Sequence, residues 1–175
     1  YALYTGTYDG GDTEAVPNQI YINGLKVSHN GADWAYETPQ YWPTNVADEL
    51  DFYAYYPYNA SVASWDAAND CVKLTAANLT TTLGDQTDWM VTTPVIGKNK
   101  DNASSGVGIV FNHITSMLLF SSKDVTADVR YQNLVSIKKI EVKNAAYTGT
   151  YTDGVWTNLT NRADVTVMTG NQGVD

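Results

Sequence analysis

The sequence predicts an all-β protein, a β-sandwich of about seven strands with at most one or two short helices. Short segments in which apolar and polar residues alternate recur along the chain, as half-buried strands require. Turn-forming pairs such as Asn23-Gly24 and Asp153-Gly154 separate these segments. Polar surface comes from 21 Thr, 15 Asn and 13 Tyr, whereas charged residues make up only 17% of the chain. This composition is typical of an uncharged β surface.

The first predicted elements are a hairpin and a long strand. The hairpin spans residues 19–27 and turns at its central Asn-Gly pair. The strand spans residues 50–56, where alternation buries the even-numbered side chains and places Tyr53 and Tyr55 on the outer face. Pro57 ends this strand, because proline has no N–H to donate to a ladder.

The later elements are less regular. Residues 69–82 fit either a helix or a strand and are the best candidate for a short helix. Residues 107–111 read as a strand, and the apolar set at 118–120 has the opposite phase, which predicts a bulge near 112–116. Residues 137–142 show a similar slip of phase. We therefore expect curved strands.

Length and charge limit the possible classes of protein. The 175 residues are expected to form a single domain over residues 1–175. Ten Lys and Arg against 19 Asp and Glu give a net charge of −9, which repels phosphate, so no nucleic-acid partner is expected. Cys71 is the only cysteine, which rules out an internal disulfide and a cysteine-based zinc site. The sequence predicts neither a metal nor a cofactor.

Few residues offer catalytic chemistry. His29 lies in a predicted turn and is expected to be solvated, whereas His113 is expected to be a hydrogen-bonded imidazole on the buried face. Ser116 lacks the Gly-x-Ser-x-Gly context of a hydrolase nucleophile. A carboxylate pair such as Asp85 and Asp88 would suit a hydrolase if both faced one cleft. We predict no catalytic residue and expect that the chain is not an enzyme.

Aromatic residues are the candidates for ligand binding. They make up 12% of the chain, and exposed rings of this kind can stack on saccharides. The alternative is that these rings fill the space between two sheets and close its ends. The candidates for a surface glycan-binding module are Trp34, Tyr41, Trp42, Tyr53 and Tyr55.

Four blocks of the sequence together resemble a known family. They are Trp34 with Gln40-Tyr41-Trp42-Pro43, Leu50-Asp51-Phe52-Tyr53-Ala54-Tyr55-Tyr56-Pro57, Asp88-Trp89-Met90, and residues 107–123 with Val110-Phe111-Asn112-His113 and Leu119-Phe120. In order and spacing they resemble the N-terminal half of the fimbrillin-like proteins, the type V pilins of Bacteroides-type anaerobes. The resemblance is strongest over residues 19–156, and its most specific part is the block that ends at Pro57.

The resemblance implies a transthyretin-like Greek-key β-sandwich, exported as a lipoprotein and found in the outer membrane or in a surface fimbria. It implies that the partners are other fimbrial subunits, joined by exchange of a β-strand between neighbours. A host or bacterial surface protein or glycan is a further expected partner. Family members usually carry a second sandwich, for which this sequence has no length, so the C-terminal domain of the family is expected to be absent.

Overall fold

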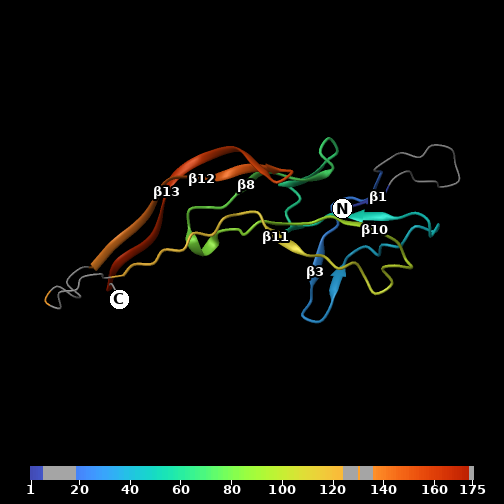
Figure 1. Cartoon of the computed structure of the whole chain (residues 1–175), viewed down its shortest axis with the longest axis horizontal. Helices are drawn as coiled ribbons and strands as arrows, with labels where there is room; N and C mark the ends of the chain where they lie inside the picture. The colour runs from blue at the N-terminus through green and yellow to red at the C-terminus, as the bar shows by residue number, and fades with distance from the viewer. Residues whose placement is uncertain (6–18, 124–129, 131–135, 174–175) are drawn as a thin grey trace.

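Figure 1 shows the computed structural model, which describes residues 1–5, 19–123, 130 and 136–173. These residues form thirteen strands in antiparallel sheets and a single 3-10 turn, η1 (Leu83–Asp85). The predicted all-β class is confirmed, and the antiparallel sheets agree with a β-sandwich. Within the described ranges there is no helix long and apolar enough to cross a membrane.

The strands are more numerous and mostly shorter than the seven that the sequence predicts, because segments expected to be continuous are interrupted. In chain order they are β1 (Ala2–Tyr4), β2 (Ile20–Ile22), β3 (Val27–His29), β4 (Trp34–Tyr36), β5 (Leu50–Phe52), β6 (Tyr55–Tyr56), β7 (Ala63–Asp66), β8 (Cys71–Asn78), β9 (Met90–Thr92), β10 (Val95–Lys98), β11 (Phe111–His113), β12 (Ser136–Thr152) and β13 (Val155–Gly173).

One core lies on a four-stranded sheet with the order β10-β5-β1-β2. Ala2 and Leu50 are completely buried there, and Tyr4, which pairs in register with Leu50, is nearly so. Apolar side chains from β2, β5 and the loop before β5 pack around them, namely Tyr21, Ile22, Trp42 and Phe52. This cluster therefore joins the start of the chain to the segment around residue 50.

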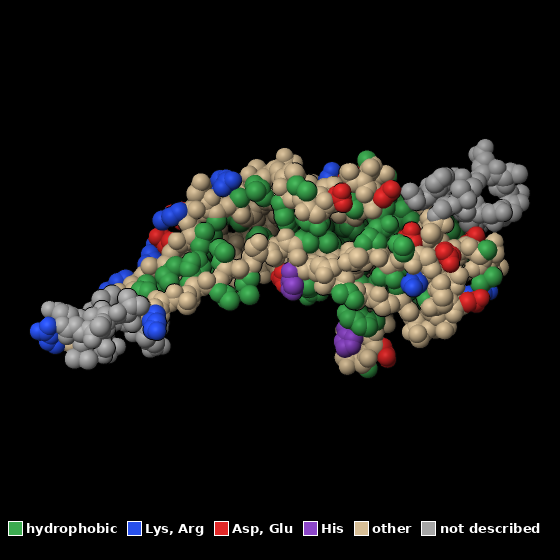
Figure 2. All heavy atoms as spheres, viewed as in Figure 1, with side chains coloured by type: hydrophobic (Ala, Val, Ile, Leu, Met, Phe, Trp, Pro, Cys, Tyr) green, Lys and Arg blue, Asp and Glu red, His purple; other side chains and the backbone are tan. Residues whose placement is uncertain are grey.

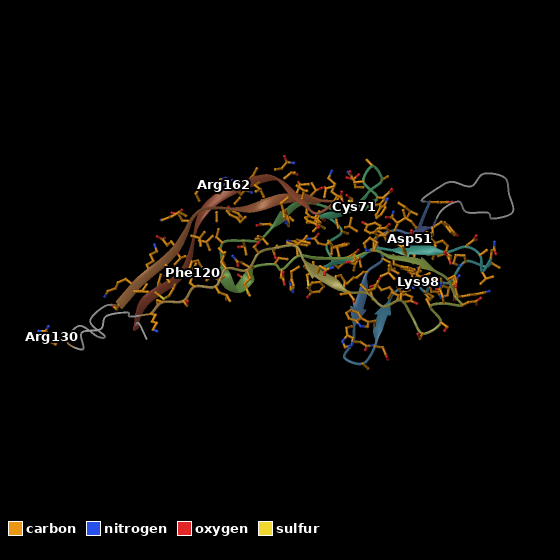
Figure 3. The ribbon with its side chains drawn as sticks, in the orientation of Figure 1. Asp51, Cys71, Lys98, Phe120, Arg130 and Arg162 are labelled. Carbon is orange, nitrogen blue, oxygen red and sulfur yellow. The ribbon has the colours of Figure 1, made fainter. Side chains whose placement is uncertain are left out.

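The Asp51 carboxylate supports the edge of this sheet. Its Oδ1 accepts hydrogen bonds from the Thr5 hydroxyl and from the Gly97 N–H, the latter at 2.8 Å. The register between β5 and β10 shifts between Val95 and Lys98, so this side chain satisfies a backbone donor that the ladder leaves unpaired. Asp51 and Lys98 both lie in the half of the molecule away from the β12–β13 hairpin (Figure 3).

A second core lies on the sheet with the order β13-β12-β8-β7. Leu74 of β8 is completely buried, and Trp89 and Tyr151 cover it together with small residues of β7 and β8. β12 and β13 have 17 and 19 residues and form a long hairpin that extends from the body (Figure 1). The Asp153-Gly154 pair at its turn has positive φ at both residues, as a two-residue hairpin turn requires.

The predicted curvature is seen in this hairpin. The register between β12 and β13 shifts at four places, two of them within residues 137–142, where the sequence shows its slip of phase. Each shift marks an irregularity of the bulge type, which bends a strand and increases its twist. Both strands are visibly curved in Figure 1.

The hairpin predicted over residues 19–27 is wrong in its pairing. β2 pairs with β1, whereas β3 pairs with β4 around a turn at residues 30–33. The Asn30 side chain explains this choice, because its Oδ1 accepts hydrogen bonds from the N–H groups of Ala32 and Asp33 and closes the later turn locally. β2 finds its partner in the first strand instead.

Two further expectations need correction. Residues 50–56 form two short strands, β5 and β6, because the chain leaves the first sheet after Phe52 and joins β9 at Tyr55. Residues 69–82 are mainly strand β8 and not a helix, since Val72 and Leu74 alternate into the core against β7. The only helical turn in the described residues follows this segment.

Candidate functional site

The five aromatic residues predicted as a glycan-binding platform do not form one surface. Trp34 and Tyr41 are exposed, with 68% and 78% of their surface accessible. Trp42 packs edge-on against Phe52, with ring centroids 5.8 Å apart, at the first core. The structure thus divides the set between solvent and core.

Tyr53 and Tyr55, expected on the outer face, are half-buried against the second core. Tyr53 contacts Trp65 edge-to-face with ring centroids 4.7 Å apart, and Tyr55 stacks on Tyr58. Burial raises the pKa of both phenols above the usual value. The expected orientation is wrong because β6 belongs to a different sheet from β5, which turns this part of the chain toward β7 and β8.

His113 is also misplaced by the sequence-based expectation. It ends β11, which pairs only with β9 in the part of the chain that the structure describes, and its side chain is 66% exposed. Its Nδ1 lies 2.7 Å from Asp88 Oδ2, and the Thr115 hydroxyl donates to Asp88 Oδ1 at 3.0 Å. The hydrogen bond from His113 lowers the pKa of Asp88, slight burial opposes this, and the bond from Thr115 lowers the pKa further. These exposed contacts connect the end of β11 to the residues just before β9.

The contact between His113 and Asp88 predicts a small loss of stability at acidic pH. The pKa of Asp88 is lower in the folded chain than its unfolded value of about 4. The stabilisation that the ionised Asp88 side chain supplies is therefore complete above about pH 4. It disappears as the pH falls through the folded pKa. Asp88→Asn should lower the free energy of unfolding near neutral pH by at most about 1 kcal/mol, since the pair is exposed.

Urea unfolding of both proteins from about pH 3 to about pH 7 checks this expectation. The two stabilities should converge at the acidic end. Asp101→Asn, in the exposed loop after β10, is the control and should follow the parent chain throughout. A constant gap between the parent chain and Asp88→Asn at every pH would contradict the assignment.

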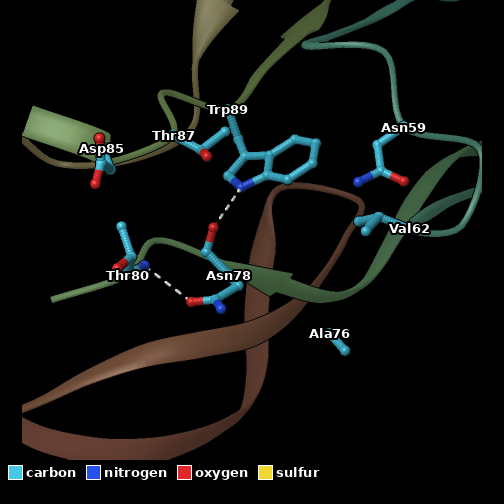
Figure 4. A pocket seen from close by; sticks show the side chains of 8 residues that line it. All are labelled: Asn59, Val62, Ala76, Asn78, Thr80, Asp85, Thr87 and Trp89. Carbon is cyan, nitrogen blue, oxygen red and sulfur yellow. Dashed lines mark hydrogen bonds between the residues drawn. The ribbon is translucent and has the colours of Figure 1, made fainter. Parts of the chain in front are cut away.

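A polar pocket of about 400 Å³ lies beside β8 and η1 (Figure 4). Trp89 Nε1 donates to Asn78 O at 3.4 Å, and Asn78 Oδ1 accepts from Thr80 N at 2.9 Å. Trp89 is only 3% exposed, so its indole offers no open face for stacking. The pocket includes Asp85, whereas Asp88 is engaged with His113, so the two carboxylates have different surroundings. Its lining residues are Asn59, Val62, Ala76, Asn78, Thr80, Asp85, Thr87 and Trp89.

The largest unexpected feature is an exposed run of apolar side chains after β11. Met117, Leu118, Leu119 and Phe120, here called the apolar segment, have 80%, 65%, 83% and 47% of their surface accessible. They belong to no strand among the described residues. Figure 3 shows Phe120 on the stretch that runs from β11 toward the open end of the β12–β13 hairpin.

The sequence pattern predicts that this segment lies in a curved strand of the sandwich, whereas the structure leaves its side chains exposed. The available signal was the continuity of four apolar residues, since a strand with one wet face alternates. A run that is apolar on both faces needs cover on both sides. Within the described residues this cover is missing.

A family model described as fimbrillin-like matches residues 4–174. No curated protein matches the chain. Among solved structures, the chain is similar to a Bacteroides uniformis protein described as a candidate cell adhesion protein, with 17% identity and a TM-score of 0.45. The match covers 99% of this chain and 61% of that one, so the chain spans about three fifths of its length.

The matched range in the family comparison includes nearly the whole sequence. It contains all four aromatic and histidine blocks on which the resemblance depends, and the predicted resemblance is confirmed. The chain therefore belongs to the fimbrillin-like family.

Proposed function

We propose that the chain is a structural subunit of a cell-surface fimbria and that it joins neighbouring subunits by β-strand complementation. Membership of the fimbrillin-like family supports the fimbrial role. Export and anchoring at the outer membrane are part of the same proposal. The observation that carries the assembly mode is the exposed apolar segment.

The backbone of the apolar segment pairs with no strand among the described residues. An unpaired extended stretch presents N–H and C=O groups that a strand from another molecule can bond. Its four side chains are apolar on both faces, so an added strand and the sheet that comes with it would bury them. Burial of about 25 cal/mol per Å² of apolar surface supplies the driving force.

The β12–β13 hairpin gives the same molecule a long free edge. Among the described strands, β13 is the outermost strand of its sheet and pairs only with β12. Protein edges are usually short, charged or covered, because a long free edge accepts further strands. A subunit with both an unpaired apolar segment and a long edge can contact neighbours through its backbone.

Proline substitution tests this proposal directly. Leu119→Pro removes one N–H and fixes φ, so it should abolish concentration-dependent self-association measured by sedimentation velocity. Leu119 is 83% exposed, so the free energy of unfolding should change by less than about 0.5 kcal/mol if the segment is unpaired in the monomer.

Ile96→Pro is the matched control, because Ile96 is a similarly exposed apolar residue, on β10. Ile96→Ser serves beside it in case proline disturbs β10. Both controls should associate as the parent chain does. Self-association that is unchanged in Leu119→Pro, or a parent chain that stays monomeric at every concentration, would contradict strand complementation at this segment.

A further inference from the structure

The β3–β4 hairpin projects from the body and has one aromatic face. Its two strands form a separate two-stranded sheet in register Val27↔Tyr36 and His29↔Trp34. Alternation places these four side chains on the same side of the hairpin. All four are exposed, and the His29 and Trp34 rings lie 5.1 Å apart. Residues 27–36 are called the aromatic hairpin below.

The aromatic hairpin is fixed at its tip and its base. At the tip, Asn30 Oδ1 accepts from two backbone N–H groups, and Asn30 N donates to Asp33 O at 3.1 Å. At the base, Lys26 Nζ lies 5.8 Å from the centre of the Tyr58 ring. A two-stranded sheet alone is only marginally stable in water, so these contacts matter for holding the face in place.

The net charge around this face is negative, because residues 26–37 carry two acidic side chains and one basic side chain, Lys26. Asp33 lies in the turn and Glu37 directly follows β4, and both are exposed. Among the described residues neither carboxylate pairs with a basic side chain. A Trp or Tyr face beside carboxylates attracts an ammonium or guanidinium group, by cation–π contact together with ion pairing. The aromatic hairpin therefore suits a cationic partner.

The same chain carries cationic groups at a different place. Residues 1–122 contain four basic and thirteen acidic side chains, whereas residues 123–175 contain six of each. Figure 2 shows Lys and Arg side chains gathered along the hairpin of β12 and β13 and Asp and Glu over the opposite half. Lys138 and Lys139, near the open end of β12, are both exposed and are called the basic arm.

The two lysines of the basic arm differ in their contacts. Lys139 pairs with Glu141, and Lys143 bridges Glu141 to Asp164, at 2.7 Å from the latter. The nearby carboxylates, Glu141 and Asp164, are therefore already paired with Lys139 and Lys143. Lys138 forms no ion pair within the described residues, so it is the group best placed to bind elsewhere.

We propose that the aromatic hairpin of one copy binds the basic arm of a second copy. The inference rests on the proposed function, because it adds a second contact between subunits that also join through strands. The two surfaces are different patches of one molecule, separated along it (Figure 1), so the contact is heterologous and repeats from copy to copy. It would orient neighbours before strands pair, as complementary charges do in other associations.

A charge exchange tests the contact on the full chain. Asp33→Lys with Glu37→Lys reverses the hairpin, and Lys138→Glu with Lys139→Glu reverses the arm. Each double variant alone should associate about tenfold more weakly than the parent chain at low ionic strength. Mixing the two variants restores opposite charges at every contact and should recover association to the level of the parent chain. Sedimentation velocity provides the measurement.

Aromatic substitutions test the ring contribution. Trp34→Ala should weaken association at low salt, whereas Tyr41→Ala, which removes a somewhat more exposed ring outside the hairpin, should not. Circular dichroism confirms that each variant is folded. If mixing the charge variants gives no recovery, or if Trp34→Ala associates as the parent does, the contact is overturned. Glycan binding that requires Trp34, with self-association unchanged, would overturn it as well.

Salt separates this contact from strand complementation. Exposed charge contacts are screened at high ionic strength, so the difference between the charge variants and the parent chain should disappear there. Strand pairing and apolar burial persist under the same conditions. At high salt, loss of self-association in Leu119→Pro therefore tests the proposed function alone. The difference in association between the charge variants and the parent chain that is present only at low salt tests the hairpin contact alone.

Discussion

Leu74→Ala should lower the free energy of unfolding by about 3 kcal/mol, within the range of about 2–5 kcal/mol that buried Leu→Ala changes cost. Leu74 has no accessible surface and lies at the centre of the cluster formed by β7, β8, Trp89 and Tyr151. Truncation removes burial of three carbons and leaves a cavity that the surrounding strands can only partly fill. This loss is a large fraction of the roughly 5–15 kcal/mol that stabilises an average domain.

Leu83→Ala provides a matched control. Leu83 starts η1 and has 45% of its surface exposed, so the same chemical change should cost less than about 0.5 kcal/mol. Urea unfolding followed by tryptophan fluorescence reports the difference, and equal m-values in the three proteins would show that only stability has changed. If the two variants unfold at the same urea concentration, the cluster around Leu74 is not the main core of this sheet.

The features that sequence predicts correctly are those that neighbouring residues determine. Alternation and turn pairs are local, so the all-β class follows from them without knowledge of which strands pair. The turn at Asp153-Gly154 and the slip within residues 137–142 are local as well, and the structure shows both, as a hairpin turn and as register shifts.

The features that sequence misses depend on pairing between distant segments. β2 pairs with β1 and not with the strand that follows the Asn23-Gly24 turn. Tyr53 is half-buried because β7 and β8 lie on the side expected to be solvent, and His113 is exposed because β11 ends at the edge of its sheet. Alternation separates the two faces of a strand but does not say which face a later segment will cover.

The sequence does not predict the exposed apolar segment, for a related reason. Apolar composition predicts burial, and residues 117–120 are therefore placed in a core by any pattern argument. Their exposure is visible only when the strands that could cover them have been assigned to other sheets. In a subunit that completes its fold through a neighbour, this conflict between composition and burial is the expected sign of the contact surface.

Gly149→Ala should also destabilise the chain, by about 1–3 kcal/mol, because the added methyl group has no room. A Cβ at this position would lie 2.9 Å from Leu159 Cδ2 and 2.9 Å from Trp156 Cε3, both on the facing strand β13. Leu159 is exposed and can move aside, but Trp156 Nε1 donates to Ile114 O at 2.7 Å, which holds the indole. Either the methyl group strains the hairpin or this hydrogen bond breaks.

The control is Gly108→Ala, since a Cβ at Gly108 meets no atom within 4 Å and its φ is not in the left-handed region. Thermal and urea unfolding should show a change of less than about 0.5 kcal/mol for this variant. Adding Leu159→Ala to Gly149→Ala should recover part of the loss, and equal stability of Gly149→Ala and Gly108→Ala would contradict the close packing. The result bears on assembly, because the Trp156 indole bonds Ile114 O, three residues before Met117, and so holds the chain just ahead of the apolar segment to β13. If the indole moves, Gly149→Ala should weaken self-association more than its loss of stability alone explains.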